Sequence, residues 1–274
     1  MARFSRPSEH FPVVYEPSFC LVAQGAKEVL LAGETYRLSP SQSLIVSVDL
    51  PLDVRVVEAT PGCPYLGLCV ALDSAVVSEI LADAAILPVG RPSRAIAVAP
   101  VNPSLTDAVI RLVALASTPQ HAEALAPLIL REITYRLLIG PLGPRLQQIA
   151  TAGAPAHRIA RAIQWLRAHF AESLPIVWLS KHVGMSPSTF YLHFKGVTGL
   201  SPLQYQKRLR LQEARRLMIG KGLDAAEAAF RVGYESASQF GREYRRMFGD
   251  SPRRDVAALA TEARRAKKSD LISR

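Results

Sequence analysis

Aromatic side chains are scarce in this chain of 274 residues, at 7% of the sequence. A protein that stacks successive bases of single-stranded nucleic acid needs many of them, so that class is disfavoured. Cysteine is rarer still, with Cys20, Cys63 and Cys69 as the whole set. Three is too few, and an odd number, for a disulfide framework, so we expect buried free thiols at Cys20 and Cys69 and a reducing compartment.

Long apolar runs are missing as well. The longest, residues 59–72, is interrupted by Pro61, Gly62 and Pro64. It is shorter than the roughly 18 residues that cross a membrane. The first residues, MARFSRPSEH, have no apolar core of the kind found in secretory signals. Hydrophobic residues still make up 49% of the chain, enough to bury a core, and we expect a cytoplasmic protein without a membrane partner.

The charge is divided unevenly along the chain. Residues 1–140 hold 10 Lys and Arg against 13 Asp and Glu, a net charge of −3, whereas residues 141–274 hold 23 against 10, a net charge of +13. The basic half indicates a polyanionic partner, and the acidic half a different task. A solvated basic surface that only aids solubility is the alternative.

The first half is rich in short apolar runs separated by turn residues, which is typical of an antiparallel sandwich or barrel. The predicted strands are Ser18–Gln24, Lys27–Ala32, Thr35–Leu38, Ser43–Val48, Asp53–Ala59 and Tyr65–Leu72. A short helix is expected over Ala75–Ala85 and an irregular crossing over residues 86–103. Apolar spacing in residues 104–139 predicts two helices that cap the sheet structure or pair with a second copy of the chain. The fold class is α+β.

A run of Gly and Pro between residues 140 and 156 predicts the domain boundary. We expect a sensing and dimerisation domain over residues 1–140 and a linker over 141–156. An all-helical domain follows over 157–260, and a basic tail over 261–274.

The helical half contains an internal repeat with an offset of 50 residues. The matched pairs are Ser186 and Ser236, Phe190 and Phe240, Phe194 and Tyr244, and Gly199 and Gly249. A repeat of this length indicates one supersecondary unit used twice. In each copy a short helix, Ile176–Val183 or Ala225–Val232, is followed by a glycine suited to a left-handed turn and a serine suited to cap a second helix.

This order of elements predicts two helix-turn-helix units joined by a long helix over Leu203–Ile219. An ordinary helical bundle is the alternative. In the second unit Phe240, Tyr244, Met247 and Phe248 share one face, which we expect to be core. Side chains beside and opposite that face are the predicted base contacts, namely Ser238, Gln239 and Arg242. Arginine reads guanine in two bonds and glutamine reads adenine, whereas Arg245 and Arg246 are expected on phosphates.

In the first unit Phe190 and Phe194 are expected to face inward. Ser188, Tyr191 and Leu192 then point toward bases. Leu192 suits a thymine methyl group, unless this unit binds weakly and mainly positions the protein. Lys181, His193 and Lys195 are the predicted phosphate contacts, with a solvated surface role as the alternative.

At these residues the chain resembles the AraC/XylS family of bacterial transcriptional regulators. The resemblance is carried by Ala228–Gly249, Ser201–Leu217 and, before residue 140, Tyr15–Ser18, Leu21–Gly25, Val46–Pro51, Pro64–Leu68 and Leu72–Asp73. It implies a cupin-like barrel that binds a small effector, dimerisation through helices, promoter DNA and RNA polymerase as partners, and no enzymatic activity. Relatives commonly carry His-Arg where this chain has Tyr191-Leu192, so the resemblance supports the base contacts of the second unit more than those of the first.

The effector half has little catalytic or metal-binding chemistry. His10 is the only histidine before His121, which disfavours a histidine metal site, and no Ser-His-Asp set, phosphate loop or C-x-x-C motif is present. Two arginine pairs, Arg3 with Arg6 and Arg91 with Arg94, are candidates for an anionic ligand such as a cyclic dinucleotide, with solvated loop arginines as the alternative. Cys20 and Cys69 are candidates for a small carbonyl or aromatic compound.

We therefore expect a dimeric, ligand-responsive, sequence-specific DNA-binding regulator without a resident cofactor. Its two reading helices would enter successive major grooves about 34 Å apart. The alternatives are a non-specific architectural DNA-binding protein whose barrel only dimerises, and an enzyme tethered to DNA.

Overall fold

The computed structural model describes residues 1–40, 42–84, 94–151, 153–259 and 261. The chain divides into two compact units. The first combines Met1–Gln164 with Ile176–Pro202, and the second combines Trp165–Pro175 with Leu203–Arg274. The first predicted helix-turn-helix thus belongs to the same compact unit as the N-terminal strands, and the second belongs to the other unit.

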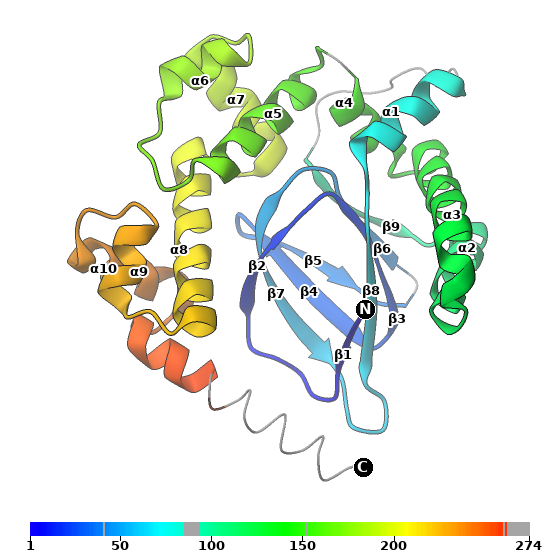
Figure 1. Ribbon diagram of the computed structural model, residues 1–274, viewed down its shortest axis with the longest axis horizontal. Helices are drawn as coiled ribbons and strands as arrows, with labels where there is room; N and C mark the ends of the chain where they lie inside the picture. The colour runs from blue at the N-terminus through cyan, green and yellow to red at the C-terminus, as the bar shows by residue number, and fades with distance from the viewer. Residues whose placement is uncertain (41, 85–93, 152, 260, 262–274) are drawn as a thin grey trace. The chain divides into compact units, whose positions relative to one another are not determined.

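The N-terminal strands form two antiparallel sheets (Figure 1). Their bounds are β1 (Ala2–Phe4), β2 (Phe11–Tyr15), β3 (Ser18–Gln24), β4 (Ala26–Leu31), β5 (Glu34–Leu38), β6 (Gln42–Val46), β7 (Leu50–Glu58), β8 (Tyr65–Ala71) and β9 (Ile96–Pro100). One sheet has the order β1-β8-β3-β6-β9 and the other β2-β7-β4-β5. The predicted α+β class and antiparallel sheets are confirmed. Within the described residues no strand pairing joins the two sheets into a closed barrel.

The six predicted strands are all present, with bounds shifted by up to three residues. Three further strands were not predicted. β1 is only three residues long and β2 contains Pro12, so neither has a clear strand pattern. β9 lies inside the segment expected to be irregular. It is a strand because it pairs with β6, Ile96 opposite Val46, and that long-range pairing leaves little local signal.

The helices follow the predicted order. Their bounds are α1 (Ser74–Asp83), α2 (Pro103–Ala114), the 3-10 turn η1 (Leu115–Ser117), α3 (Pro119–Ile139), α4 (Gly143–Ala150), α5 (Pro155–Ala168), α6 (Ile176–His182), α7 (Pro187–Thr198), α8 (Pro202–Lys221), α9 (Ala225–Arg231) and α10 (Ala237–Phe248). Residues 252–259 are also helical. α4 occupies much of the segment predicted as a linker. Asp73 and Asn102 cap α1 and α2 by accepting from backbone N–H groups two residues onward.

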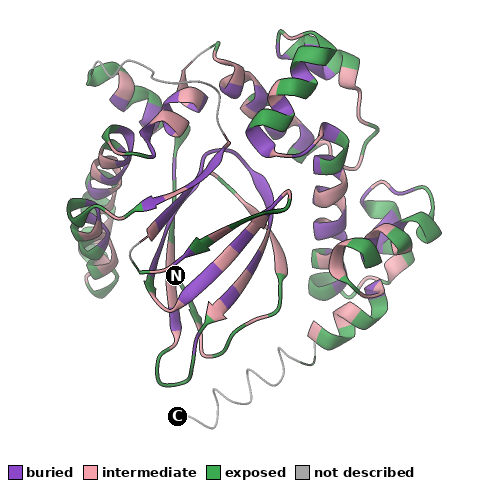
Figure 2. Cartoon of the chain, turned by 180° about the vertical axis from the view of Figure 1, so that it is seen from behind, coloured by how far each residue is buried: buried purple, intermediate pink, exposed green. Residues whose placement is uncertain are grey.

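Burial follows this arrangement. Figure 2 shows buried residues along the strands of both sheets, and many exposed residues on the helices. Phe19, Leu44, Leu50 and Leu52 are completely buried in the sheets. In the second unit the core gathers around Phe240 and Tyr244. Among the described residues, no helix combines the length and the apolar character required to cross a bilayer.

Candidate DNA-reading helices and effector pocket

Each helix-turn-helix bends at a glycine with a left-handed backbone. Gly184 follows α6 with φ +70°, and Gly233 follows α9 with φ +86°. Residues with a Cβ rarely adopt such angles. A Cβ on Gly233 would also collide with the backbone of Ala171, so both conformation and space require glycine there. The predicted turns are confirmed.

The second helix of each unit is capped in the same way at both ends. The Ser186 hydroxyl accepts from the Thr189 backbone N–H, and the Ser236 hydroxyl accepts from that of Gln239, each at 3.3 Å. Both serines satisfy N–H groups that a helix start leaves unpaired, as the sequence predicted. α7 and α10 end on Gly199 and Gly249, both in the left-handed conformation. The second helices of the two units, α7 and α10, therefore begin and end alike.

α10 has one buried and one exposed face. Phe240 and Tyr244 are buried, and Met247 and Phe248 pack against the same core half-buried, which confirms the predicted inner face. All five of the side chains predicted to touch DNA on this helix are exposed, namely Ser238, Gln239, Arg242, Arg245 and Arg246. The helix thus presents amide, hydroxyl and guanidinium groups to solvent.

α7 likewise has one buried and one exposed face, built from different side chains. Phe190 and Phe194 are completely buried. Of the residues predicted to touch DNA in this unit, His193 is half-buried, and the exposed ones are Lys181, Ser188, Tyr191, Leu192 and Lys195. Leu192 is 71% exposed and so contributes little to the core, which leaves it free for an apolar contact outside this unit.

A network around Glu243 orders the exposed face of α10. Lys207 donates to the Glu243 carboxylate at 2.6 Å, Tyr234 at 2.8 Å and Gln239 at 3.3 Å. Burial acts to raise the pKa of Glu243, but these three hydrogen bonds outweigh it and the pKa is lowered. Gln239, a predicted base contact, is therefore already oriented by a carboxylate one turn further along the helix.

Arg210 on α8 forms hydrogen bonds that hold the turn of the second helix-turn-helix in place. Its guanidinium donates to the backbone carbonyls of Phe170, Ala171, Glu172 and Gly233 at 2.6–3.2 Å. Burial lowers the pKa of Arg210 and outweighs the electrostatic interactions with Tyr234, Glu243 and Glu235, which act to raise it. Sequence reasoning missed this residue, because nothing local marks an arginine whose acceptors lie 23 to 40 residues away.

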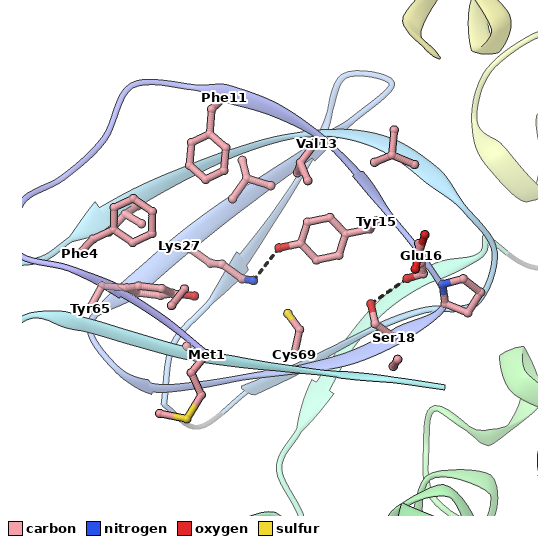
Figure 3. A pocket seen from close by; sticks show the side chains of 17 residues that line it. Met1, Phe4, Phe11, Val13, Tyr15, Glu16, Ser18, Lys27, Tyr65 and Cys69 are labelled. Atoms are coloured by element: carbon pink, nitrogen blue, oxygen red, sulfur yellow. Dashed lines mark hydrogen bonds between the residues drawn. The ribbon is translucent and has the colours of Figure 1, made fainter. Parts of the chain in front are cut away.

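A cavity of about 530 Å³ lies between the two sheets (Figure 3). Its walls are mostly apolar and come from β1, β2, β3, β4, β7 and β8. Lys27 is buried on its wall, and its Nζ donates to the Tyr15 hydroxyl at 3.1 Å. Tyr65 also lines the cavity, and burial raises the pKa of its hydroxyl. Among the described residues no group of His, Cys, Asp and Glu has the arrangement needed to hold a metal ion.

Sequence reasoning also missed Lys27. The signal was available, because Lys27, Val29 and Leu31 alternate along β4 and all three are buried. A lysine on the buried face of a strand is unusual and indicates a partner or a ligand.

The predicted arginine sites do not meet at this cavity. Arg3 and Arg6 are exposed and neither lines it. Arg94 pairs with Glu34 at 2.9 Å and does not line it either. Arg91 lies outside the described residues.

The expectation of free thiols at Cys20 and Cys69 is wrong. The two residues are directly opposite each other on β3 and β8 and form a disulfide. Their separation of 49 residues in sequence hides a pairing that only the sheet register creates. Cys69 lines the cavity, and Cys63 is a free, exposed thiol.

Comparison with known proteins connects both regions to one family. A family model described as AraC-type transcriptional regulator N-terminus matches residues 1–145, more than half of the chain, and a helix-turn-helix domain model matches residues 179–257. The HTH-type transcriptional activator RhaS of Escherichia coli O1:K1 is 30% identical over 153 residues, which cover 56% of this chain and 55% of RhaS. The chain thus spans about half the length of the curated relatives it matches.

Solved structures of ToxT from Vibrio cholerae share the fold across nearly the whole chain. One superposes with a TM-score of 0.57 over 93% of this chain and 95% of ToxT, at 9% identity. A complex of ToxT with (E)-4-(8-methylnaphthalen-1-yl)but-3-enoic acid gives 0.59 over 89% and 93%, also at 9% identity. By the match of its N-terminal half, supported by the helix-turn-helix model, the chain belongs to the AraC-type transcriptional regulators.

Proposed function

We propose that this chain is a sequence-specific DNA-binding transcription regulator whose operator binding is controlled by a small effector. Residues 157–260 would bind DNA, and residues 1–140 would sense the effector. The proposal is carried by helices α7 and α10, which are capped alike and each expose side chains that we predict to contact bases. As a regulator acting at promoters, the protein would also contact RNA polymerase.

Fluorescence anisotropy of the full chain tests this proposal. The probes are the DNA upstream of its own gene and a scrambled duplex of equal length, each titrated across a salt series. We expect at least about tenfold preference for the upstream DNA, equivalent to about 1.4 kcal/mol. Equal and steeply salt-dependent binding to both duplexes would favour the architectural alternative, which needs positive charge but no base-reading side chains.

The effector would be a molecule with an apolar body and one anionic group, bound between the two sheets. Lys27 supports this class, because a buried ammonium is costly unless an opposite charge offsets it, and the Tyr15 hydroxyl is neutral. The apolar walls suit a small hydrophobic body better than the bases and phosphates of a cyclic dinucleotide, which require several polar partners. One ToxT structure is described as bound to an unsaturated fatty acid, a ligand of this class.

The chain would act as a homodimer that associates through α3. Leu125, Leu128, Tyr135 and Ile139 are exposed there, and their spacing places them within an arc of about 80° on the helix surface. Together with Glu132, these residues follow one another at alternating steps of three and four, a spacing typical of the contact face between two paired helices. We expect Leu128→Glu to convert a dimer into a monomer in analytical ultracentrifugation, with the exposed α2 substitution Ser104→Glu as the control. An unchanged sedimentation coefficient for Leu128→Glu would exclude this contact face.

A further inference from the structure

The Cys20–Cys69 disulfide joins two strands that are already held together by backbone pairing. On either side of it Phe19 pairs with Val70 and Leu21 with Leu68, and the two Cα atoms of the cysteines are 4.1 Å apart. The backbone hydrogen bonds between β3 and β8 do not depend on the sulfur atoms. After reduction the two thiols would therefore stay opposite each other, ready to pair again without refolding of the sheet.

The two sulfurs differ in access. Cys20 is completely buried, whereas Cys69 is exposed and lines the cavity, with its sulfur directed into it in Figure 3. A small thiol that enters the cavity reaches Cys69 and not Cys20. Attack at the Cys69 sulfur makes Cys20 the leaving group, so a thiol can open the disulfide at only one of its two sulfur atoms.

The surroundings of Cys20 also suit a reduced thiol. The Ser18 hydroxyl lies 4.0 Å from the Cys20 sulfur and donates its proton to the Glu16 carbonyl at 2.8 Å. Its lone pairs are thus available to accept from a Cys20 S–H. A buried thiol that has an acceptor in place gains a partner on reduction rather than becoming an unsatisfied group.

We propose that Cys20 and Cys69 form a reversible thiol–disulfide couple on the wall of the effector cavity. In the reducing direction a small thiolate attacks the Cys69 sulfur, the Cys20–Cys69 bond breaks, and Cys20 leaves and takes up a proton. A second thiolate then attacks the external sulfur of the mixed disulfide, which releases the free disulfide and a Cys69 thiolate. In the oxidising direction a disulfide of the glutathione class accepts two electrons and leaves as two thiols.

The redox state would change what the cavity binds. As a disulfide, Cys69 is tied to the wall and carries no charge. Once reduced, its side chain rotates freely and its thiolate form shares the cavity with the Lys27 ammonium, where it competes with an anionic occupant. This consequence rests on the proposed effector cavity, but the thiol–disulfide equilibrium itself does not.

The test uses the full chain carrying Cys63→Ser, which removes the exposed third thiol. The protein is equilibrated in mixtures of reduced and oxidised glutathione, quenched with iodoacetamide and weighed intact by mass spectrometry. We expect a transition between no alkylated thiol and two, at a single midpoint, with an unchanged far-ultraviolet circular dichroism spectrum. In Cys20→Ser the remaining Cys69 should be alkylated at least tenfold faster than Cys20 is in Cys69→Ser.

Binding of 1-anilinonaphthalene-8-sulfonate, an apolar anion, tests the consequence in both redox states. We expect at least threefold weaker binding to the reduced protein, and no redox effect in Cys69→Ser. Two alkylated thiols in every mixture, or a disulfide that is reduced only after urea unfolds the chain, would overturn the couple. If the thiols titrate as expected but the sulfonate binds equally well to the oxidised and the reduced protein, only the proposed effect on the cavity would be overturned. Operator affinity, measured separately, distinguishes either result from failure of the proposed function.

Discussion

Arg215 on α8 and Asp255 in the helical segment 252–259 form an ion pair with two hydrogen bonds, of 2.7 and 2.5 Å. Both side chains are nearly buried, at 12% and 10% exposed. Tyr244 of α10 donates its hydroxyl to the same carboxylate at 2.6 Å, and burial raises the pKa of that hydroxyl. Asp255 therefore connects α10 to α8 through side-chain hydrogen bonds.

Substituting Asp255→Ala should reduce the free energy of unfolding by about 3 kcal/mol, because it leaves the Arg215 guanidinium buried without its counter-ion. Urea titration followed by circular dichroism measures the loss. The matched control is Arg216→Ala, because the pair of Arg216 with Glu213 is largely exposed on the arginine side and its loss should leave stability almost unchanged. Equal effects of the two substitutions would contradict the assigned role of Asp255.

Gly233→Ala should destabilise the second unit by about 2 kcal/mol or more, because the new Cβ requires both a strained backbone and displacement of Ala171. Gly241→Ala, in the middle of α10, meets nothing within 4 Å and should be neutral or stabilise the helix by up to about 1 kcal/mol. Comparing the thermal unfolding of the two variants distinguishes the need for glycine at the turn from the general effect of glycine and alanine on helix stability. A neutral Gly233→Ala would show that the turn can relax.

Arg242→Ala should cost about 1–3 kcal/mol on operator DNA and little on scrambled DNA, because the lost contact is to a base. Arg245→Ala should weaken both duplexes alike and lower the slope of affinity against salt by about 1, since a phosphate contact releases a counter-ion. Anisotropy titrations at several salt concentrations measure both effects. The same loss on both duplexes for Arg242→Ala would exclude it as a base contact.

Lys27→Met should weaken binding of an apolar carboxylate such as decanoate while leaving the chain folded, because it removes the cavity's buried cation and keeps its volume. Isothermal titration calorimetry should show at least about a tenfold loss of affinity, equivalent to about 1.4 kcal/mol. The control Tyr15→Phe removes only the hydroxyl and should keep most of the affinity. Undiminished decanoate binding to Lys27→Met would place the anion elsewhere.

The pH dependence of stability should report the Glu243 network. Since the pKa of Glu243 is lowered in the folded state, its contribution is present above the unfolded value of about 4.3 and is lost as the pH falls through the folded value. Lys207→Met should cost about 1 kcal/mol at pH 7, and the difference from the parent chain should shrink below about pH 4. The exposed Lys221→Met serves as the control, and a pH-independent difference would assign the loss to packing.

Much of the helical half is predictable from local sequence. Gly184, Gly233, Ser186 and Ser236 act on backbone within a few residues of themselves, so their turns and caps are visible before any tertiary contact is known. The buried faces of α7 and α10 follow from helical period alone. The six predicted strands of the first half also have a local pattern, whereas β1, β2 and β9 were missed. β9 is a strand because it pairs with the distant β6.

The two helix-turn-helix units, their exposed faces and the antiparallel sheets of the first half could be predicted from local sequence, because each depends on short-range periodicity and capping. Three other features are visible only in the folded chain: the disulfide between Cys20 and Cys69, the place of Lys27 on the wall of an apolar cavity, and the hydrogen bonds of Arg210 to four distant carbonyls. These features arise from strand register and from helix packing between segments tens of residues apart. No local pattern encodes the distance between two side chains that meet only when the chain has folded.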